Sequence, residues 1–154
     1  MNLFPWKKKE PDFFTEEEKA QLVAAIQKAE QRTSGEVRVF VESRCKFIDA
    51  ADRAQELFFM LGMDKTAERN GTLIYLAVKD KQAAVYGDEG IHQKVGAQYW
   101  KDEVAKMMQH FRQEHLADGM CQGITDLGEV LVHYFPYDRQ TDKNELPDEI
   151  VFGK

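Results

Sequence analysis

The sequence predicts a single α/β domain in which a small mixed sheet lies between two layers of helices, a three-layer α/β/α sandwich. Two observations predict this class. Helical and strand-like periodicities follow one another in the order α, β, α, β, β, α, α. Residues 73–78 form an unbroken apolar run, which is typical of a central strand covered by helices on both faces. A chain of 154 residues, 43% of them hydrophobic, has room for one such domain.

We expect the domain to span residues 13–136. It follows an N-terminal leader at residues 1–12, which holds two prolines, three consecutive lysines and no periodicity. An acidic C-terminal tail at residues 137–154 comes after it and finishes in a short apolar run at 150–152. Short tails with an apolar end dock on their own domain or on a partner, and the role of this one is left open.

The first half of the domain is predicted to fold as a helix, a strand and a second helix. Thr15 and Glu18 have the spacing of a capping box, and apolar residues at helical spacing then continue to about residue 31. Residues 37–41 carry valine at every second position, which predicts a strand with one well-buried face. Asp49 is placed to cap the second helix, which is expected to end near Gly62.

The second half is predicted to hold two strands and two helices. The turn at residues 70–71 precedes the central strand, and a polar turn at 79–82 leads into a third strand at 83–86. One long helix is then expected to run to a break at residues 117–119. The final helix carries apolar residues at helical spacing from Met120 to Tyr134.

This topology brings three polar turns together. The crossover between the first two strands should be right-handed, which makes these strands parallel, and the short turn makes the third strand antiparallel. The beginnings of the first two strands and the end of the third therefore share one edge of the sheet. We expect residues 35–36, 69–71 and 87–90 to converge there.

Glu36, Asn70, Asp88 and Glu89 are the candidate metal ligands at this edge. Carboxylate, amide and backbone carbonyl oxygens are the ligands that Ca²⁺ or Mg²⁺ prefers, and a cation would relieve the repulsion between nearby carboxylates. The alternative is ordinary turn chemistry, with Asp88 and Glu89 capping the helix that follows. The sequence leaves both interpretations open.

Composition and motifs exclude several classes of function. A net charge of -6 disfavours a broad nucleic-acid-binding surface. The apolar runs are far shorter than the roughly 20 residues of a membrane-spanning helix, and no signal-peptide pattern follows the leader. We therefore expect no stable membrane insertion and a cytoplasmic protein. Cys45 and Cys121 are expected to be reduced thiols, and the four histidines show no metal-binding spacing.

Four short segments, taken in order, resemble the TPM domain family: residues 31–39, 68–75, 86–91 and 119–124. This family groups a plant thylakoid lumen protein, a photosystem II repair protein and a nematode modulator of acetylcholine receptors. The resemblance implies a single α/β/α sandwich. The positions that match the family's motifs are Ser34, Gly35, Glu36, Asn70, Gly71, Gly87, Asp88, Glu89 and Gly90.

The resemblance also implies candidate activities, because some relatives have been associated with acid phosphatase activity and with divalent cation binding. Many relatives are exported and membrane-anchored, and this sequence departs from that pattern. The first hypothesis is an uncharacterised accessory domain that binds a divalent cation, a protein partner or both. The alternatives are a metal-assisted acid phosphatase, with Asp88 or Glu89 as ligand or general base, and a purely structural interaction protein. The sequence does not determine catalytic residues, a substrate or an oligomeric state.

Overall fold

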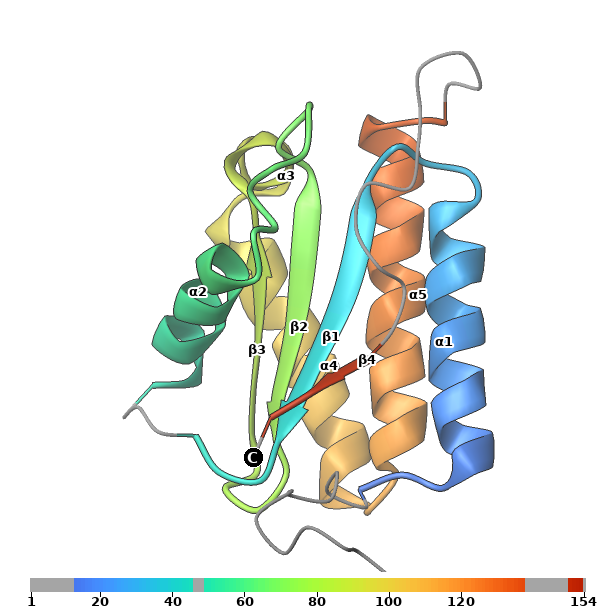
Figure 1. Ribbon diagram of the computed structural model, residues 1–154, viewed down its shortest axis with the longest axis vertical. Helices are drawn as coiled ribbons and strands as arrows, with labels where there is room; N and C mark the ends of the chain where they lie inside the picture. Colours follow the sequence, from blue (N-terminus) through green and yellow to red (C-terminus); the bar gives the residue numbers. More distant parts are fainter. Residues whose placement is uncertain (1–12, 46–48, 138–149, 154) are drawn as a thin grey trace, which may run out of the picture.

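The computed structural model describes residues 13–45, 49–137 and 150–153. Within them the chain forms the predicted three-layer α/β/α sandwich, with four strands in one mixed sheet (Figure 1). The helices are α1 (Glu16–Glu30), α2 (Ala50–Met60), α3 (Glu89–Val95), α4 (Ala97–Arg112) and α5 (Leu116–Tyr134). The strands are β1 (Glu36–Glu42), β2 (Gly71–Ala77), β3 (Gln82–Gly87) and β4 (Ile150–Phe152), in the spatial order β3-β2-β1-β4.

The sheet separates two hydrophobic cores. On one face α2 packs its buried side chains, among them Phe58, against Leu73 and Tyr75 of β2. On the other face α1, α4 and α5 cover the sheet, with Ile26 and Ile124 in the core (Figure 1). Every residue of β2 is buried, because helices cover this strand from both sides. The unbroken apolar run in the sequence reflects this position.

Local signals at the starts of the first two helices form as predicted. The Thr15 hydroxyl accepts from the Glu18 N–H at 3.1 Å, while the Glu18 carboxylate accepts from the Thr15 N–H at 2.8 Å. Asp49 caps α2 by accepting from the Ala51 N–H at 2.9 Å. These bonds satisfy backbone donors that have no partner within the helix, so the starts of both helices can be found in the sequence.

The predicted long helix is in fact two helices, and its end is not where the sequence suggested. α3 and α4 are separated at Gly96, which has φ +82. The second break lies at residues 113–115, where Glu114 has φ +60, and the predicted break at 117–119 lies inside α5. Gly119 is there for close packing, since a Cβ on it would lie 2.7 Å from a ring carbon of Phe111.

The C-terminal segment adds a strand that the sequence did not reveal. Ile150–Phe152 pairs in parallel with β1, with Val39 opposite Ile150 and Val41 opposite Phe152. The apolar end of the tail therefore docks on its own domain and makes β1 an interior strand. The leader at 1–12 and most of the tail, 138–149, lie outside the described residues.

Candidate functional site

The three polar turns lie together at one end of the sheet, as the topology predicts. The β-sheet register places Glu36 opposite Gly71. The Asp88 N–H donates to the Gly71 carbonyl, and the Gly90 N–H donates to the Arg69 carbonyl, both at 2.9 Å. This end, next to α3 at the top of Figure 1, is called the motif edge below. The opposite end, where β1 and β2 finish, is called the carboxyl edge.

Asp88 is held by an arginine to which sequence reasoning gave no role. Arg69 binds it through two parallel contacts, Nε to Oδ2 at 2.7 Å and Nη2 to Oδ1 at 2.8 Å. The hydrogen bond to Asp88 raises the pKa of Arg69, so the guanidinium stays charged. Asp88 Oδ1 also accepts from the Glu89 N–H at 2.8 Å and caps α3. The helix-cap interpretation of Asp88 is therefore confirmed.

Asn70 stands at the centre of a second polar group on the motif edge. Its Nδ2 donates to Ser34 Oγ at 3.1 Å and to Glu68 Oε2 at 3.3 Å, and Ser34 Oγ donates to the same Glu68 oxygen at 2.6 Å. The Oδ1 atom of Asn70 is buried and accepts no hydrogen bond from the described residues. A buried acceptor without a donor costs free energy, and a cation could relieve that cost.

The four predicted ligands are neighbours at the motif edge, but they do not form a ready cation site. Glu36, Asn70 and Asp88 are buried, whereas Glu89 is exposed. The guanidinium of Arg69 engages both oxygens of Asp88. Within residues 13–45, 49–137 and 150–153, no three His, Cys, Asp or Glu side chains are grouped so that they could hold a metal ion. Cation binding through Asp88 would require Arg69 to release it, so the ligand assignment stays a prediction.

A cavity of about 290 Å³ opens beside the Arg69–Asp88 pair. Its walls combine aromatic rings with charged side chains: Phe59, Arg69, Val85, Tyr86, Gly87, Asp88, Glu89, His92 and Trp100. Phe59 on α2 is 44% exposed, and its ring centroid lies 6.0 Å from that of Tyr86. The Trp100 indole donates to His92 Nδ1 at 2.9 Å, which fixes the proton of the neutral imidazole on Nε2.

Sequence reasoning missed most of this cavity for a physical reason. Its walls come from α2, β3, α3 and α4, and no local pattern links a residue of α2 to one of α4. Trp100 is largely buried and also forms part of the wall. One sequence signal could have pointed to the cavity: Phe59 and Met60 are adjacent apolar residues that do not lie on the buried face of α2.

Gly90 allows the two turns of the motif edge to approach each other. A Cβ at this position would lie 2.2 Å from the Glu68 carbonyl oxygen and 2.6 Å from that of Arg69. Both are backbone atoms and cannot turn away as a flexible side chain could. The glycine is therefore required for the contact that sets Arg69 beside Asp88.

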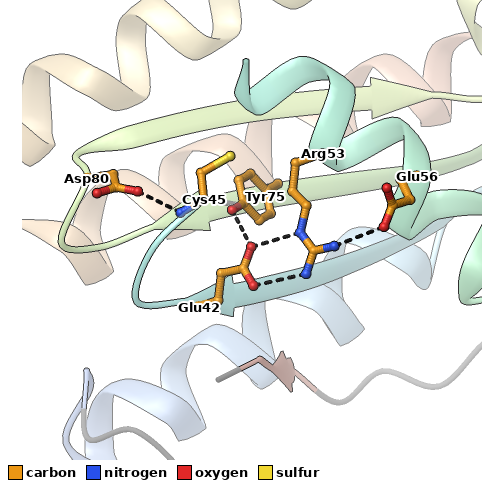
Figure 2. Close-up of polar contacts among 6 residues, drawn as sticks. All are labelled: Glu42, Cys45, Arg53, Glu56, Tyr75 and Asp80. Carbon is orange, nitrogen blue, oxygen red and sulfur yellow. Dashed lines mark hydrogen bonds and ion pairs between the residues drawn. The ribbon is translucent and has the colours of Figure 1, made fainter. Parts of the chain in front are cut away.

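A different polar cluster lies at the carboxyl edge, on the α2 face of the sheet (Figure 2). Arg53 binds Glu42 through Nε at 2.9 Å and Nη2 at 3.0 Å, and the Tyr75 hydroxyl donates to the same carboxylate. Burial, followed by the hydrogen bond to Glu42, raises the pKa of Tyr75 far above its ordinary value, so it remains a donor. All three side chains are buried, and the cluster has the character of a structural network.

The two cysteines are free thiols, which agrees with the sequence prediction. The backbone N–H of Cys45 donates to Asp80 Oδ2 at 2.7 Å (Figure 2). Burial raises the pKa of the Cys121 thiol, which disfavours the nucleophilic thiolate form.

The comparison with protein-family models gives a match to the TPM domain over residues 8–130. The chain belongs to the TPM domain family. The sequence resemblance points to the same family, and the match covers the motif edge and every residue that lines its cavity. A search of the curated proteins gives no match.

Solved structures of related proteins share the fold of this TPM domain. The BA42 protein from the psychrophilic bacterium Bizionia argentinensis is 41% identical, with a TM-score of 0.84 over 94% of this chain and 99% of that one. The N-terminal domain of a protein from P. gingivalis has a TM-score of 0.67 at 16% identity, covering 80% of each chain. The N-terminal domain of cg2496 from Corynebacterium glutamicum has a TM-score of 0.63 at 14% identity, covering 85% of this chain and 86% of that one.

In the part of the chain that the structure describes, no helix combines the length and the apolar character that crossing a membrane requires.

Proposed function

We propose that this TPM domain is an accessory binding module that docks a protein partner at the motif edge. The observation that carries the proposal is the cavity of about 290 Å³ there, in which exposed aromatic surface adjoins charged groups. Exposed aromatic side chains beside polar groups are typical of the centres of protein interfaces. Met60, 65% exposed, extends the apolar surface of Phe59 along α2.

The charges at the cavity favour a partner that presents a basic side chain. Arg69 already neutralises Asp88, and the exposed carboxylate of Glu89 remains at the rim. A lysine or arginine could lie against Glu89 and across the aromatic wall, where cation–π attraction adds to the ion pair. The net charge of -6 supports the same choice of partner.

Site-specific photo-crosslinking in the native host tests this proposal. A photoreactive phenylalanine analogue at Phe59 should give one dominant protein adduct, and the matched analogue at Gln27, exposed on α1, should not. Adding Glu89→Lys to the Phe59 probe should abolish the adduct without changing the melting temperature. Equal adducts at both positions, or none at Phe59, would overturn the proposal.

A second candidate function is divalent cation binding at the motif edge, favoured by the buried Oδ1 of Asn70 that lacks a donor. Titration with Ca²⁺ and Mg²⁺ during heat denaturation tests it. At about 100 times the dissociation constant, binding stabilises the fold by about 2.7 kcal/mol. That gain should vanish in Asn70→Ala and persist in Glu17→Gln, which changes an exposed acid on α1. An unchanged melting temperature at millimolar cation would remove this candidate.

Two alternatives stay predictions: a metal-assisted acid phosphatase, which rests on the family resemblance, and a purely structural interaction protein. In the observed arrangement Asp88 is committed to Arg69 and to the cap of α3, which does not favour it as a general base. Turnover of a phosphate monoester that disappears in Asp88→Ala with Glu89→Ala would support the phosphatase. Turnover that survives both changes would remove the site assignment.

The cytoplasmic location also stays a prediction, which cell fractionation can test.

A further inference from the structure

A second cavity, of about 330 Å³, lies at the carboxyl edge, far from the motif edge. It sits between the turn that joins β2 to β3 and the turn that joins α4 to α5, on the sheet face opposite α2. Its lining residues are Leu76, Val78, Lys81, Met108, Phe111, Arg112, Glu114 and Leu116. The cavity therefore lies beside the end of β2 and the β2–β3 turn, where α4 ends and α5 begins.

The inner lining of this cavity is apolar. Leu76 is buried to 1% exposure, whereas Phe111 and Leu116, which pack against the same core, are only half-buried. Apolar side chains left partly exposed around a concavity are typical of a small-molecule site. A volume of about 330 Å³ is at the lower end of the range for such sites, so a single short chain fits and a two-chain lipid does not.

The charged side chains around the cavity favour a negatively charged ligand. Lys81 and Arg112 are exposed, and neither forms an ion pair within the described residues. Glu114 is the acid among the lining residues, so the cavity carries two cations against one anion in a protein of net charge -6. The forked guanidinium of arginine matches a carboxylate through two parallel hydrogen bonds.

The backbone at the rim is held in an uncommon conformation. Lys81 has φ +53 and Glu114 has φ +60, in the left-handed region that L-residues rarely adopt. Both are among the three described non-glycine residues with positive φ, and both line this one cavity. Glu114 is in the αL position of a Schellman cap that ends α4, where the N–H groups of Glu114 and His115 donate to the carbonyls of Phe111 and His110. Lys81 lies in the tight turn between β2 and β3, so the two turns that end these elements also form the rim of the cavity.

We propose that the cavity at the carboxyl edge binds the carboxylate form of a medium-chain fatty acid. The alkyl chain lies along Leu76, Met108 and Phe111, and the carboxylate lies between Lys81 and Arg112. This site is independent of the motif edge, so the proposed partner binding can fail without affecting it. No covalent step is involved.

Calorimetric titration with decanoate below its micellar concentration tests the proposal. Wild-type protein should bind decanoate at one site, bind decanol about tenfold or more weakly, and not bind decyltrimethylammonium. Equal affinity for decanoate and decanol would overturn the proposal, because the cations would then contribute nothing. Tighter binding of decyl phosphate than of decanoate would overturn the choice of a carboxylate head group.

Variants locate the site. Lys81→Gln with Arg112→Gln should weaken decanoate binding about tenfold or more and leave decanol binding unchanged, while Lys101→Gln, an exposed cation elsewhere on α4, should bind as wild type. Met108→Trp should exclude the alkyl chain with both cations intact. Methyl resonances of Leu76 and Leu116 should shift on binding, and that of Ile91 near the motif edge should not. Wild-type affinity in the double variant, or shifts at Ile91 alone, would overturn the assignment.

Discussion

The two ends of the sheet each hold an arginine bound through two contacts to a buried carboxylate, and the two pairs differ in their access to solvent. At the carboxyl edge, Arg53 and Glu42 have side chains that are 9% and 1% exposed. At the motif edge, the Asp88 side chain is 1% exposed but that of Arg69 is 38% exposed. The arginine–carboxylate pair is therefore closed to solvent at the carboxyl edge, whereas the pair at the motif edge is open to a cavity.

The difference follows from what surrounds each guanidinium. Arg53 lies 5.9 Å from the Phe40 ring centroid and also contacts Glu56, in a site that Tyr75 helps to close. Arg69 instead forms part of the cavity wall beside Phe59. The closed ion pair secures the packing of α2 on the sheet, whereas the open one leaves the Arg69 guanidinium partly exposed in the cavity wall. The following predictions test this contrast.

The largest effect is expected for Arg53→Ala. Removing one partner of a buried pair leaves the Glu42 charge in the core, which costs about 3–5 kcal/mol of unfolding free energy. Urea denaturation measures this cost. The control is Arg44→Ala, which breaks an exposed pair with Asp80 and should cost about 1 kcal/mol or less. Similar costs for both variants would contradict the description of the carboxyl edge as closed.

The second effect is a dependence of the unfolding free energy on pH, which arises from a buried acid that is not paired with an arginine. Glu103 on α4 is 3% exposed and lies beside Asp126 of α5, with Lys106 Nζ at 3.5 Å from its carboxylate. Burial, followed by the hydrogen bond to Asp126, raises the pKa of Glu103 to about 7. The folded state therefore binds a proton that the unfolded state releases near pH 4.5, so stability falls as pH rises from about 4.5 to 7.

We expect this loss to be about 3 kcal/mol, and to be absent in Glu103→Gln, which keeps a hydrogen-bonding side chain without titrating. Urea denaturation between pH 4.5 and 8 measures it. Asp102→Gln, an exposed acid on the same helix, is the control and should keep the wild-type slope. A wild-type slope in Glu103→Gln would assign the pH dependence to another group.

A smaller effect is expected at the motif edge. Asp88→Ala removes the cap of α3 and the partner of Arg69, and the lost cap costs about 0.5–2 kcal/mol. Asp88→Asn should retain most of the cap and so cost less, because an amide oxygen also accepts from a backbone N–H. Urea denaturation of both variants beside Arg53→Ala ranks the two edges. A cost for Asp88→Ala above that for Arg53→Ala would reverse the comparison.

The smallest effect on stability is expected for Phe59→Ser. Its ring is 44% exposed and packs only at the edge of the core, against Phe58 and Tyr86, so the unfolding free energy should fall by about 1 kcal/mol. Leu57→Ala, a fully buried position on the same helix, should cost about 2–5 kcal/mol under the same conditions. A large loss in Phe59→Ser would show that the aromatic wall supports the fold, and the binding role of the cavity would lose its basis.

The sequence predicted the convergence at the motif edge because handedness and turn length are local rules. A right-handed crossover and a short turn are enough to place Glu36, Asn70 and Asp88 at one end of the sheet. The sequence could not predict that the Arg69 guanidinium would bind the Asp88 carboxylate. That contact depends on the angle at which the two turns meet and on the absence of a side chain at Gly90. A metal ion at Asp88 therefore competes with the Arg69 guanidinium for the same two carboxylate oxygens.

What the sequence by itself determined are the features carried by hydrogen bonds and periodicities within a few residues. These are the caps at Thr15 and Asp49, the buried central strand and the topology of the first three strands. Tertiary structure alone decided the docking of β4 on β1, the division between α3 and α4, and the walls of both cavities. These depend on contacts between residues far apart in the chain, whose partners are chosen by shape and burial, properties that no local pattern records.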